Sequence, residues 1–133
     1  NLEDSFKEAR DILKDGGYFI FSCFGPQTLK ELRACFKIEQ NHLPCKELIY
    51  NYLKSAGFKD INIETELRCK YFDDLTGILY WLKNIGANRI NPLQPYLAPG
   101  KLADLNESYR SNYRNNGRVY AGFEVIWVEA VKS

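Results

Sequence analysis

Hydrophobic residues recur at helical spacing along much of the chain. The first such stretch ends at Gly16-Gly17, because glycine takes the left-handed conformation at little cost. Thr28 is expected to cap the second predicted helix, Pro44 to open the third at its first turn, and Asp73 to cap the fourth. The pattern predicts helices over residues 2–14, 27–36, 44–56, 74–85 and 101–113.

Three other stretches have the patterns of β-strands. Residues 18–24 are apolar at every position except a serine and a cysteine, which predicts a strand buried on both faces, as in a parallel sheet. Residues 60–71 alternate between apolar and polar, which predicts a half-buried antiparallel strand near a sheet edge. Residues 119–131 are apolar on both faces and are expected to form the central strand. Three strands cannot close a barrel, so we predict an α/β fold with a small mixed sheet packed against helices.

Composition narrows the class of protein. The chain has 133 residues, a net charge of +1 and a hydrophobic share of 45%. These values exclude intrinsic disorder for most of the chain and a uniformly basic nucleic-acid-binding surface. The apolar runs are too short to span a bilayer, and no signal peptide is found. Because the chain begins with Asn1 and contains no methionine, we expect it to be part of a longer protein.

Cysteine and histidine give no metal or redox motif. The four cysteines are too far apart for a CxxC pair, so we expect free, mostly buried thiols in a cytoplasmic protein. Cys23 and Cys69 lie within predicted strands. His42 is the only histidine, and it is expected to be a solvated loop residue rather than a ligand.

The order of elements, with its residues, resembles the C-terminal half of a class I S-adenosylmethionine-dependent methyltransferase with a Rossmann-like fold. Residues 13–22 are similar to that fold's fourth crossover helix, glycine turn and fifth strand, and residues 54–58 to the approach to its sixth strand. The resemblance implies that the last strand lies between the other two. It also implies a helical insertion or lid over residues 73–118, between residues 1–72 and the last-strand segment 119–133.

A narrower resemblance is to the malonyl-acyl-carrier-protein O-methyltransferase family of biotin synthesis. Residues 24–32, 71–74 and 82–88 carry it, and Leu82-Lys83-Asn84-Ile85-Gly86-Ala87-Asn88 is the most specific segment. It implies transfer of a methyl group to the free carboxylate of a malonyl thioester. Other readings are a small-molecule carboxyl or O-methyltransferase and a non-catalytic binding module.

The glycine-rich loop with which this class grips its cofactor is missing from the sequence. We therefore expect S-adenosylmethionine to serve the whole enzyme but not to bind this chain alone, which is expected to be inactive by itself. No catalytic residue is assigned.

Candidate acceptor contacts fall in two places. One is the carboxyl end of the first strand, where open α/β sheets bind ligands, with Cys23, Phe24 and Gln27. The other is the insertion, with Tyr80 and Trp81. The competing explanation is core packing for Cys23, Phe24, Tyr80 and Trp81, and a helix start for Gln27.

Residues 89–118 carry a net charge of +3 on a chain that is otherwise close to neutral. The cations Arg89, Arg110, Arg114 and Arg118 suggest an acidic partner, and the resemblance implies acyl carrier protein. A solvated face is the alternative. The strand Tyr18–Phe24 lacks proline and charge, so we also expect that it could pair with a second copy to form a homodimer.

Overall fold

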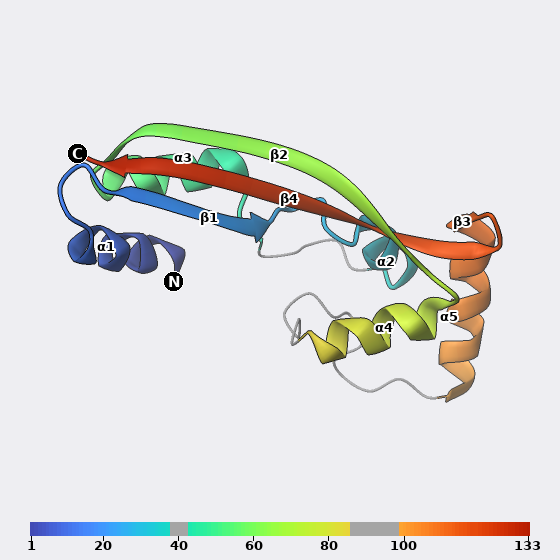
Figure 1. The fold of residues 1–133 in the computed structure, drawn as a ribbon. Coiled ribbons are helices and arrows are strands. Elements are labelled where there is room, and N and C mark those ends of the chain that lie inside the picture. Colours follow the sequence, from blue (N-terminus) through green and yellow to red (C-terminus); the bar gives the residue numbers. More distant parts are fainter. Residues whose placement is uncertain (38–42, 86–98) are drawn as a thin grey trace. The chain divides into compact units, whose positions relative to one another are not determined.

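The computed structural model describes residues 1–37, 43–85 and 99–133. His42 and Arg89 lie outside the described residues. The elements, in chain order (Figure 1), are α1 (Leu2–Ile12), β1 (Tyr18–Phe24), α2 (Lys30–Cys35), α3 (Lys46–Ser55), β2 (Phe58–Phe72), α4 (Leu75–Asn84), α5 (Pro99–Asn112), β3 (Arg114–Asn115) and β4 (Arg118–Lys132).

The described residues form two compact units. Unit 1 holds residues 1–26, 43–67 and 124–133, and unit 2 holds residues 27–37, 68–85 and 99–123. Both β2 and β4 contribute residues to each unit.

The strand order is β1-β4-β2, with β3 paired to β4. β1 and β4 are antiparallel, from Tyr18 opposite Val131 to Phe24 opposite Val125. The predicted α/β class and the central place of the last strand are thus confirmed. β3 is an addition that the sequence analysis missed, although Asn116-Gly117, with φ of 54° and 78°, is a recognised hairpin turn signal.

Unit 1 has its core on one side of the sheet. Phe6 of α1 and Ile49 and Leu53 of α3 pack there against Ile126 and Val128 of β4. On the other side the side chains of β1 are open, with Ile20 71% exposed. The expectation that β1 is buried on both faces is therefore wrong for the described chain, because α1 and α3 cover the same side.

The buried positions of β4 change along the strand. Val119, Ala121 and Phe123 are buried in unit 2, whereas Ile126 and Val128 are buried in unit 1. The buried side chains therefore move from odd to even positions, which explains why the sequence looked apolar on both faces. Trp127 lies at an odd position in the half of β4 where the even positions are buried, so its side chain points away from the core and is 44% exposed.

The burial expected along β2 holds only for its first half. Ile61 and Ile63 are half-buried against the unit 1 core, whereas Leu67, Cys69 and Tyr71 are exposed. β2 is the last strand in the sheet order, and the unit 1 core ends at Ile63.

Unit 2 packs α2, α4 and α5 together. α4 buries its predicted stripe, Leu75, Ile78, Leu79 and Leu82, while Ile85 is 46% exposed. None of the helices in the described residues is long and apolar enough to cross a membrane.

Two predicted helix caps in unit 2 are wrong. Asp74, not Asp73, caps α4, because its carboxylate accepts the Gly77 N–H at 2.8 Å. α2 begins at Lys30 after Leu29, which has φ 58° and makes no side-chain cap. Thr28, expected to cap it, is instead buried.

Candidate functional site

The carboxyl end of β1 is closely packed against β4. The Gly25 N–H donates to the Glu124 carbonyl oxygen at 2.8 Å, and a Cβ at Gly25 would overlap the Glu124 carboxylate. Cys23 packs against the unit 1 core, and burial, followed by the charge of Glu124, raises the pKa of its thiol. The thiol therefore stays protonated at neutral pH, which suits packing rather than nucleophilic chemistry. Phe24 is half-buried beside it, and Gln27 is exposed in the turn before α2.

The aromatic candidates lie in unit 2. Trp81 of α4 contacts Phe72 at 5.8 Å between ring centroids and Phe123 edge-to-face at 5.4 Å. The Lys70 ammonium lies 5.4 Å from the Trp81 ring centroid and 5.6 Å from that of Phe72. We call these four residues the aromatic platform. Tyr80, the residue before Trp81 in α4, is 67% exposed, so core packing does not explain it.

A second polar group in unit 2 was not foreseen. Glu31 is only 6% exposed, and its carboxylate accepts the Gly122 N–H at 3.1 Å. Tyr109 is fully buried, and its hydroxyl donates to the Tyr120 carbonyl oxygen. Burial, with the Glu31 charge second, raises the pKa of both Tyr109 and Tyr113.

Only the spacing of the two tyrosines could have revealed this group. Tyr109 and Tyr113 are four residues apart on a predicted helix, and their rings lie 4.9 Å apart. Nothing in the sequence around Glu31 indicated its role, because its hydrogen bond with Gly122 joins residues 91 positions apart.

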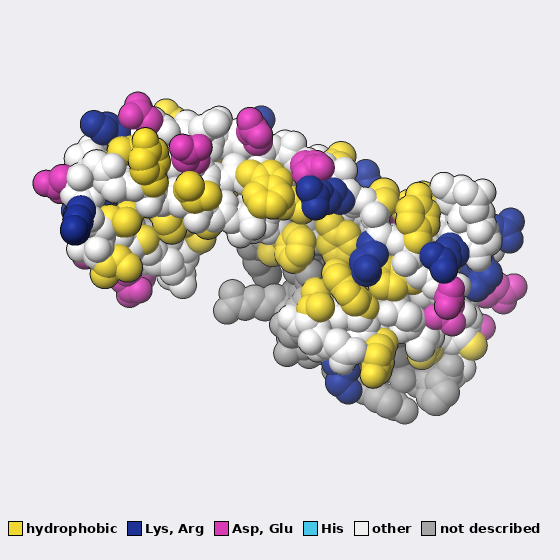
Figure 2. Space-filling view, viewed as in Figure 1, with side chains coloured by type: hydrophobic (Ala, Val, Ile, Leu, Met, Phe, Trp, Pro, Cys, Tyr) yellow, Lys and Arg dark blue, Asp and Glu magenta, His cyan; other side chains and the backbone are white. Residues whose placement is uncertain are grey.

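The predicted basic surface is partly organised by Asp73. Its carbonyl oxygen accepts a hydrogen bond from the Arg110 guanidinium at 2.8 Å, and its carboxylate pairs with Arg118 at 3.8 Å. Arg114 is exposed and has no ion pair in the part of the chain that the structure describes. Figure 2 shows several Lys and Arg side chains beside hydrophobic ones over the α4 and α5 region.

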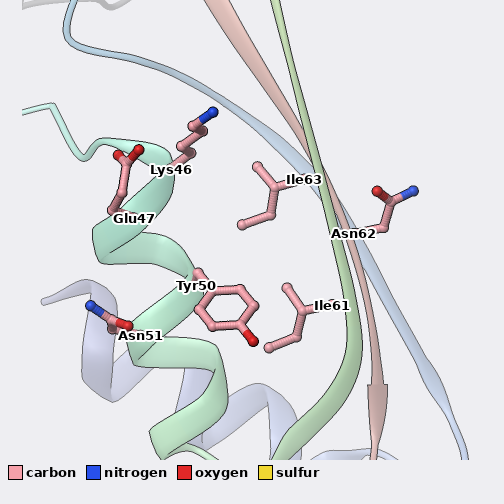
Figure 3. A pocket seen from close by; sticks show the side chains of 7 residues that line it. All are labelled: Lys46, Glu47, Tyr50, Asn51, Ile61, Asn62 and Ile63. Atoms are coloured by element: carbon pink, nitrogen blue, oxygen red, sulfur yellow. The ribbon is translucent and has the colours of Figure 1, made fainter.

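A shallow pocket in unit 1 lies between α3 and β2 (Figure 3). It has a volume of about 550 Å³ and an apolar side formed by Tyr50, Ile61 and Ile63. Lys46 and Glu47 place opposite charges on its α3 side. None of the residues expected from the sequence to contact the acceptor lines this pocket, and its mixed charges favour no one ligand.

The chain shares its fold with a solved structure. Over 98% of its length it is similar to a solved structure of a candidate methyltransferase from Bacillus halodurans C-125, with a TM-score of 0.58 and 15% identity, covering 62% of that structure. The chain therefore has the fold expected from the sequence, part of a class I methyltransferase.

Comparison with curated protein sequences shows a more specific similarity than the fold does. The chain is 32% identical to the malonyl-[acyl-carrier protein] O-methyltransferase of Nitrosospira multiformis, 33% to that of Methylovorus sp. and 34% to that of Gallionella capsiferriformans. Each comparison covers 99% of this chain but 45%, 47% and 48% of the relatives, so the chain spans about half their length. No protein-family model matches the chain. The resemblance to the C-terminal part of these enzymes is thereby confirmed.

Proposed function

We propose that this chain is the acceptor-binding part of an enzyme that methylates the free carboxylate of malonyl-acyl carrier protein. The supporting observation is the similarity along 99% of the chain to relatives named for that reaction. The described fold fits this role, because a helical segment, α4 and α5, is inserted between β2 and β4.

The proposed reaction makes modest chemical demands on the acceptor side. A malonyl carboxylate is already ionised at neutral pH and can act as the nucleophile without a general base. A bond forms between a carboxylate oxygen and the methyl carbon, the carbon–sulfur bond of the sulfonium breaks, and both charges are lost. Alignment of the two groups is then the main requirement, so the chain's residues must hold and orient the acceptor.

The described residues lack the glycine-rich loop with which this class of enzyme binds S-adenosylmethionine. β1 is followed by Gly25-Pro26 and then by the turn that leads into α2, and no glycine-rich turn between a strand and a helix is found among the described residues. In the whole enzyme that cofactor supplies the methyl group. We assign its binding to the part of the relatives' length that this chain does not span.

We further propose that the exposed arginines of unit 2 dock the acidic carrier protein. Arg110 and Arg118 are held together by Asp73, and Arg114 has no ion pair within the described segments. Arg89, which was predicted to join them, lies outside the described residues. Such surface charges chiefly raise the rate of encounter.

This docking is tested by charge reversal. We expect Arg114→Glu with Arg118→Glu to raise the dissociation constant for acyl carrier protein by roughly tenfold at low salt and by less at high salt. Lys59→Glu, at an exposed position in unit 1, is the matched control. Equal binding by the double variant and the control would mean that the arginines are only a solvated face.

The activity itself is tested in a chimaera. This chain would replace the matched segment of the Nitrosospira multiformis relative, and transfer of a labelled methyl group to malonyl-acyl carrier protein would be measured. We expect methylation of the malonyl form and none of the acetyl form, which has no free carboxylate. A folded chimaera that methylates only small free acids would instead favour a small-molecule methyltransferase. One that methylates nothing would favour a binding module.

We also propose that the enzyme acts in the cytoplasm. The four cysteines, Cys23, Cys35, Cys45 and Cys69, are free in the structure, as predicted. Free thiols persist most readily in a reducing compartment. Cys23, Cys35 and Cys45 are half-buried and Cys69 is exposed, so the expectation of mostly buried thiols is wrong.

A further inference from the structure

We propose that the aromatic platform binds the carboxylate end of the acyl group, with Lys70 as the residue that recognises the charge. This inference rests on the proposed function and adds a residue to it. Lys70 was not among the candidates from the sequence, where it is one exposed position of an alternating strand.

The charge of Lys70 is available to a ligand. Its side chain is exposed, and its ammonium makes no hydrogen bond or ion pair in the described parts of the chain. Its neighbours are the rings of Trp81 and Phe72, at 5.4 and 5.6 Å. Rings stabilise the cation through their faces without neutralising it, so the ammonium keeps its capacity for a charge-assisted hydrogen bond.

The rings below Lys70 are fixed in place. Trp81 is held between Phe72 and Phe123, and Phe123 is only 5% exposed. Trp81 itself is half-buried, so part of its surface is open to solvent. An apolar surface beside an unpaired cation matches a short acyl chain that ends in a carboxylate.

Two other polar groups are less suited to that ligand. At the end of β1 the carboxylate of Glu124 lies close enough to raise the pKa of the Cys23 thiol, so it would repel a second carboxylate. Tyr113 is also poorly placed to bind a carboxylate, because the negative charge of Glu31 lies nearby.

A lysine at this position also accounts for release of the product. Methylation removes the charge of the carboxylate, so the ester loses the charge-assisted bond that held the acid. Because Lys70 contacts the ground state and the transition state alike, it is a specificity residue whose loss affects KM more than kcat.

The kinetic test uses Lys70→Gln, Lys70→Arg and the control Lys83→Gln in the chimaera described above. Lys83 is an exposed cation in the last turn of α4, with no ring contact among the described residues. The acceptors are malonyl-acyl carrier protein and a malonyl thioester of N-acetylcysteamine, which lacks the carrier. We expect Lys70→Gln to raise KM about tenfold or more for both acceptors with kcat little changed, and Lys70→Arg to restore most of the loss. An unchanged KM, or an equal change in Lys83→Gln, would overturn the proposal.

A binding test separates this inference from the proposed function. In a Trp127→Phe background Trp81 is the sole tryptophan of the chain, and its fluorescence reports directly on the platform. We expect a saturable change with the malonyl thioester, none with the acetyl thioester, and loss of the change in Lys70→Gln. Circular dichroism would verify the fold of each variant. A fluorescence change without methyl transfer in the chimaera would refute the proposed methylation but support the aromatic platform as a binding site. No fluorescence change in a folded chain would refute the platform as a binding site.

Discussion

At the scale of single residues, Tyr109 combines deep burial with a specific hydrogen bond. Its hydroxyl donates to the Tyr120 carbonyl oxygen, and both burial and the Glu31 charge raise its pKa. The folded protein therefore keeps the proton of Tyr109 at pH values where an unfolded chain loses it. A raised pKa of this kind contributes stability below the unfolded value that is lost as pH rises above it.

This gives a prediction with a definite sign. The free energy of unfolding should fall as pH rises above about 10, the ordinary pKa of tyrosine, and Tyr109→Phe should reduce that fall. At pH 7 the same variant should be less stable by roughly 1 kcal/mol, because the Tyr120 carbonyl loses its donor. Urea unfolding at several pH values measures both effects. If the free energy of unfolding falls as steeply above about pH 10 in Tyr109→Phe as in the original chain, groups other than Tyr109 cause the fall.

Lys70 and Asp73 show why residue identity alone was insufficient. Lys70 belongs to an alternating strand, and nothing nearby in the sequence shows that Trp81, eleven positions on, lies beneath its ammonium. Asp73 was expected to cap a helix and instead binds Arg110 and Arg118. Both roles depend on where α4 and α5 pack, which local spacing does not specify.

At the scale of elements, the start of α4 allows two adjacent aspartates to be compared. Asp74 accepts the Gly77 N–H at 2.8 Å, whereas Asp73 lies outside the helix with a 92% exposed side chain. We expect Asp74→Ala to lower the free energy of unfolding by about 1 kcal/mol, and Asp73→Ala by less than about 0.5 kcal/mol. Urea denaturation of the two variants measures the difference. Equal losses would show that the cap contributes no more than the surface ion pair.

The turn into α2 is a second element that needs particular residues. The Leu29 N–H donates to the Gly122 carbonyl oxygen at 2.7 Å, and the Gly122 N–H donates to Glu31. A Cβ at Gly122 would approach a Glu31 carboxylate oxygen at 2.9 Å, closer than real side chains come. Glycine at this position therefore allows α2 to bond to β4 in the middle of the strand.

At the scale of the whole molecule, one edge of β1 is unpaired among the strands that the structure describes. It is the terminal strand of the order β1-β4-β2, and Tyr18 and Ile20 beside that edge are 64% and 71% exposed. We propose that two copies of this chain pair along Tyr18–Phe24, because an unpaired edge without charge or proline is a template for another strand.

Light scattering over a range of concentrations tests this pairing. We expect a species above 15.4 kDa for the original chain and a return to 15.4 kDa for Ile20→Lys, since lysine blunts an edge strand. Ile12→Lys, at an 86% exposed position of α1, should leave the assembly unchanged. A 15.4 kDa species for the original chain at every concentration would exclude the dimer.

The sequence by itself determined most of the elements and the class of fold. Hydrophobic period is a local property, so it located α1, β1, α3, α4 and β4 to within a few residues and marked β4 as the central strand. The same pattern, with segments such as residues 82–88, carried the resemblance that the relatives bear out.

Only the tertiary structure decided which faces are covered and which distant residues meet. β4 looked apolar on both faces, but its burial passes from Phe123 to Ile126, because different helices pack on its two halves. The contact of Glu31 with Gly122 and that of Lys70 with Trp81 are likewise absent from any local pattern. The hydrophobic periodicity of the sequence shows that a side chain needs a packing partner, whereas the packing of helices on the sheet decides which residue that partner is.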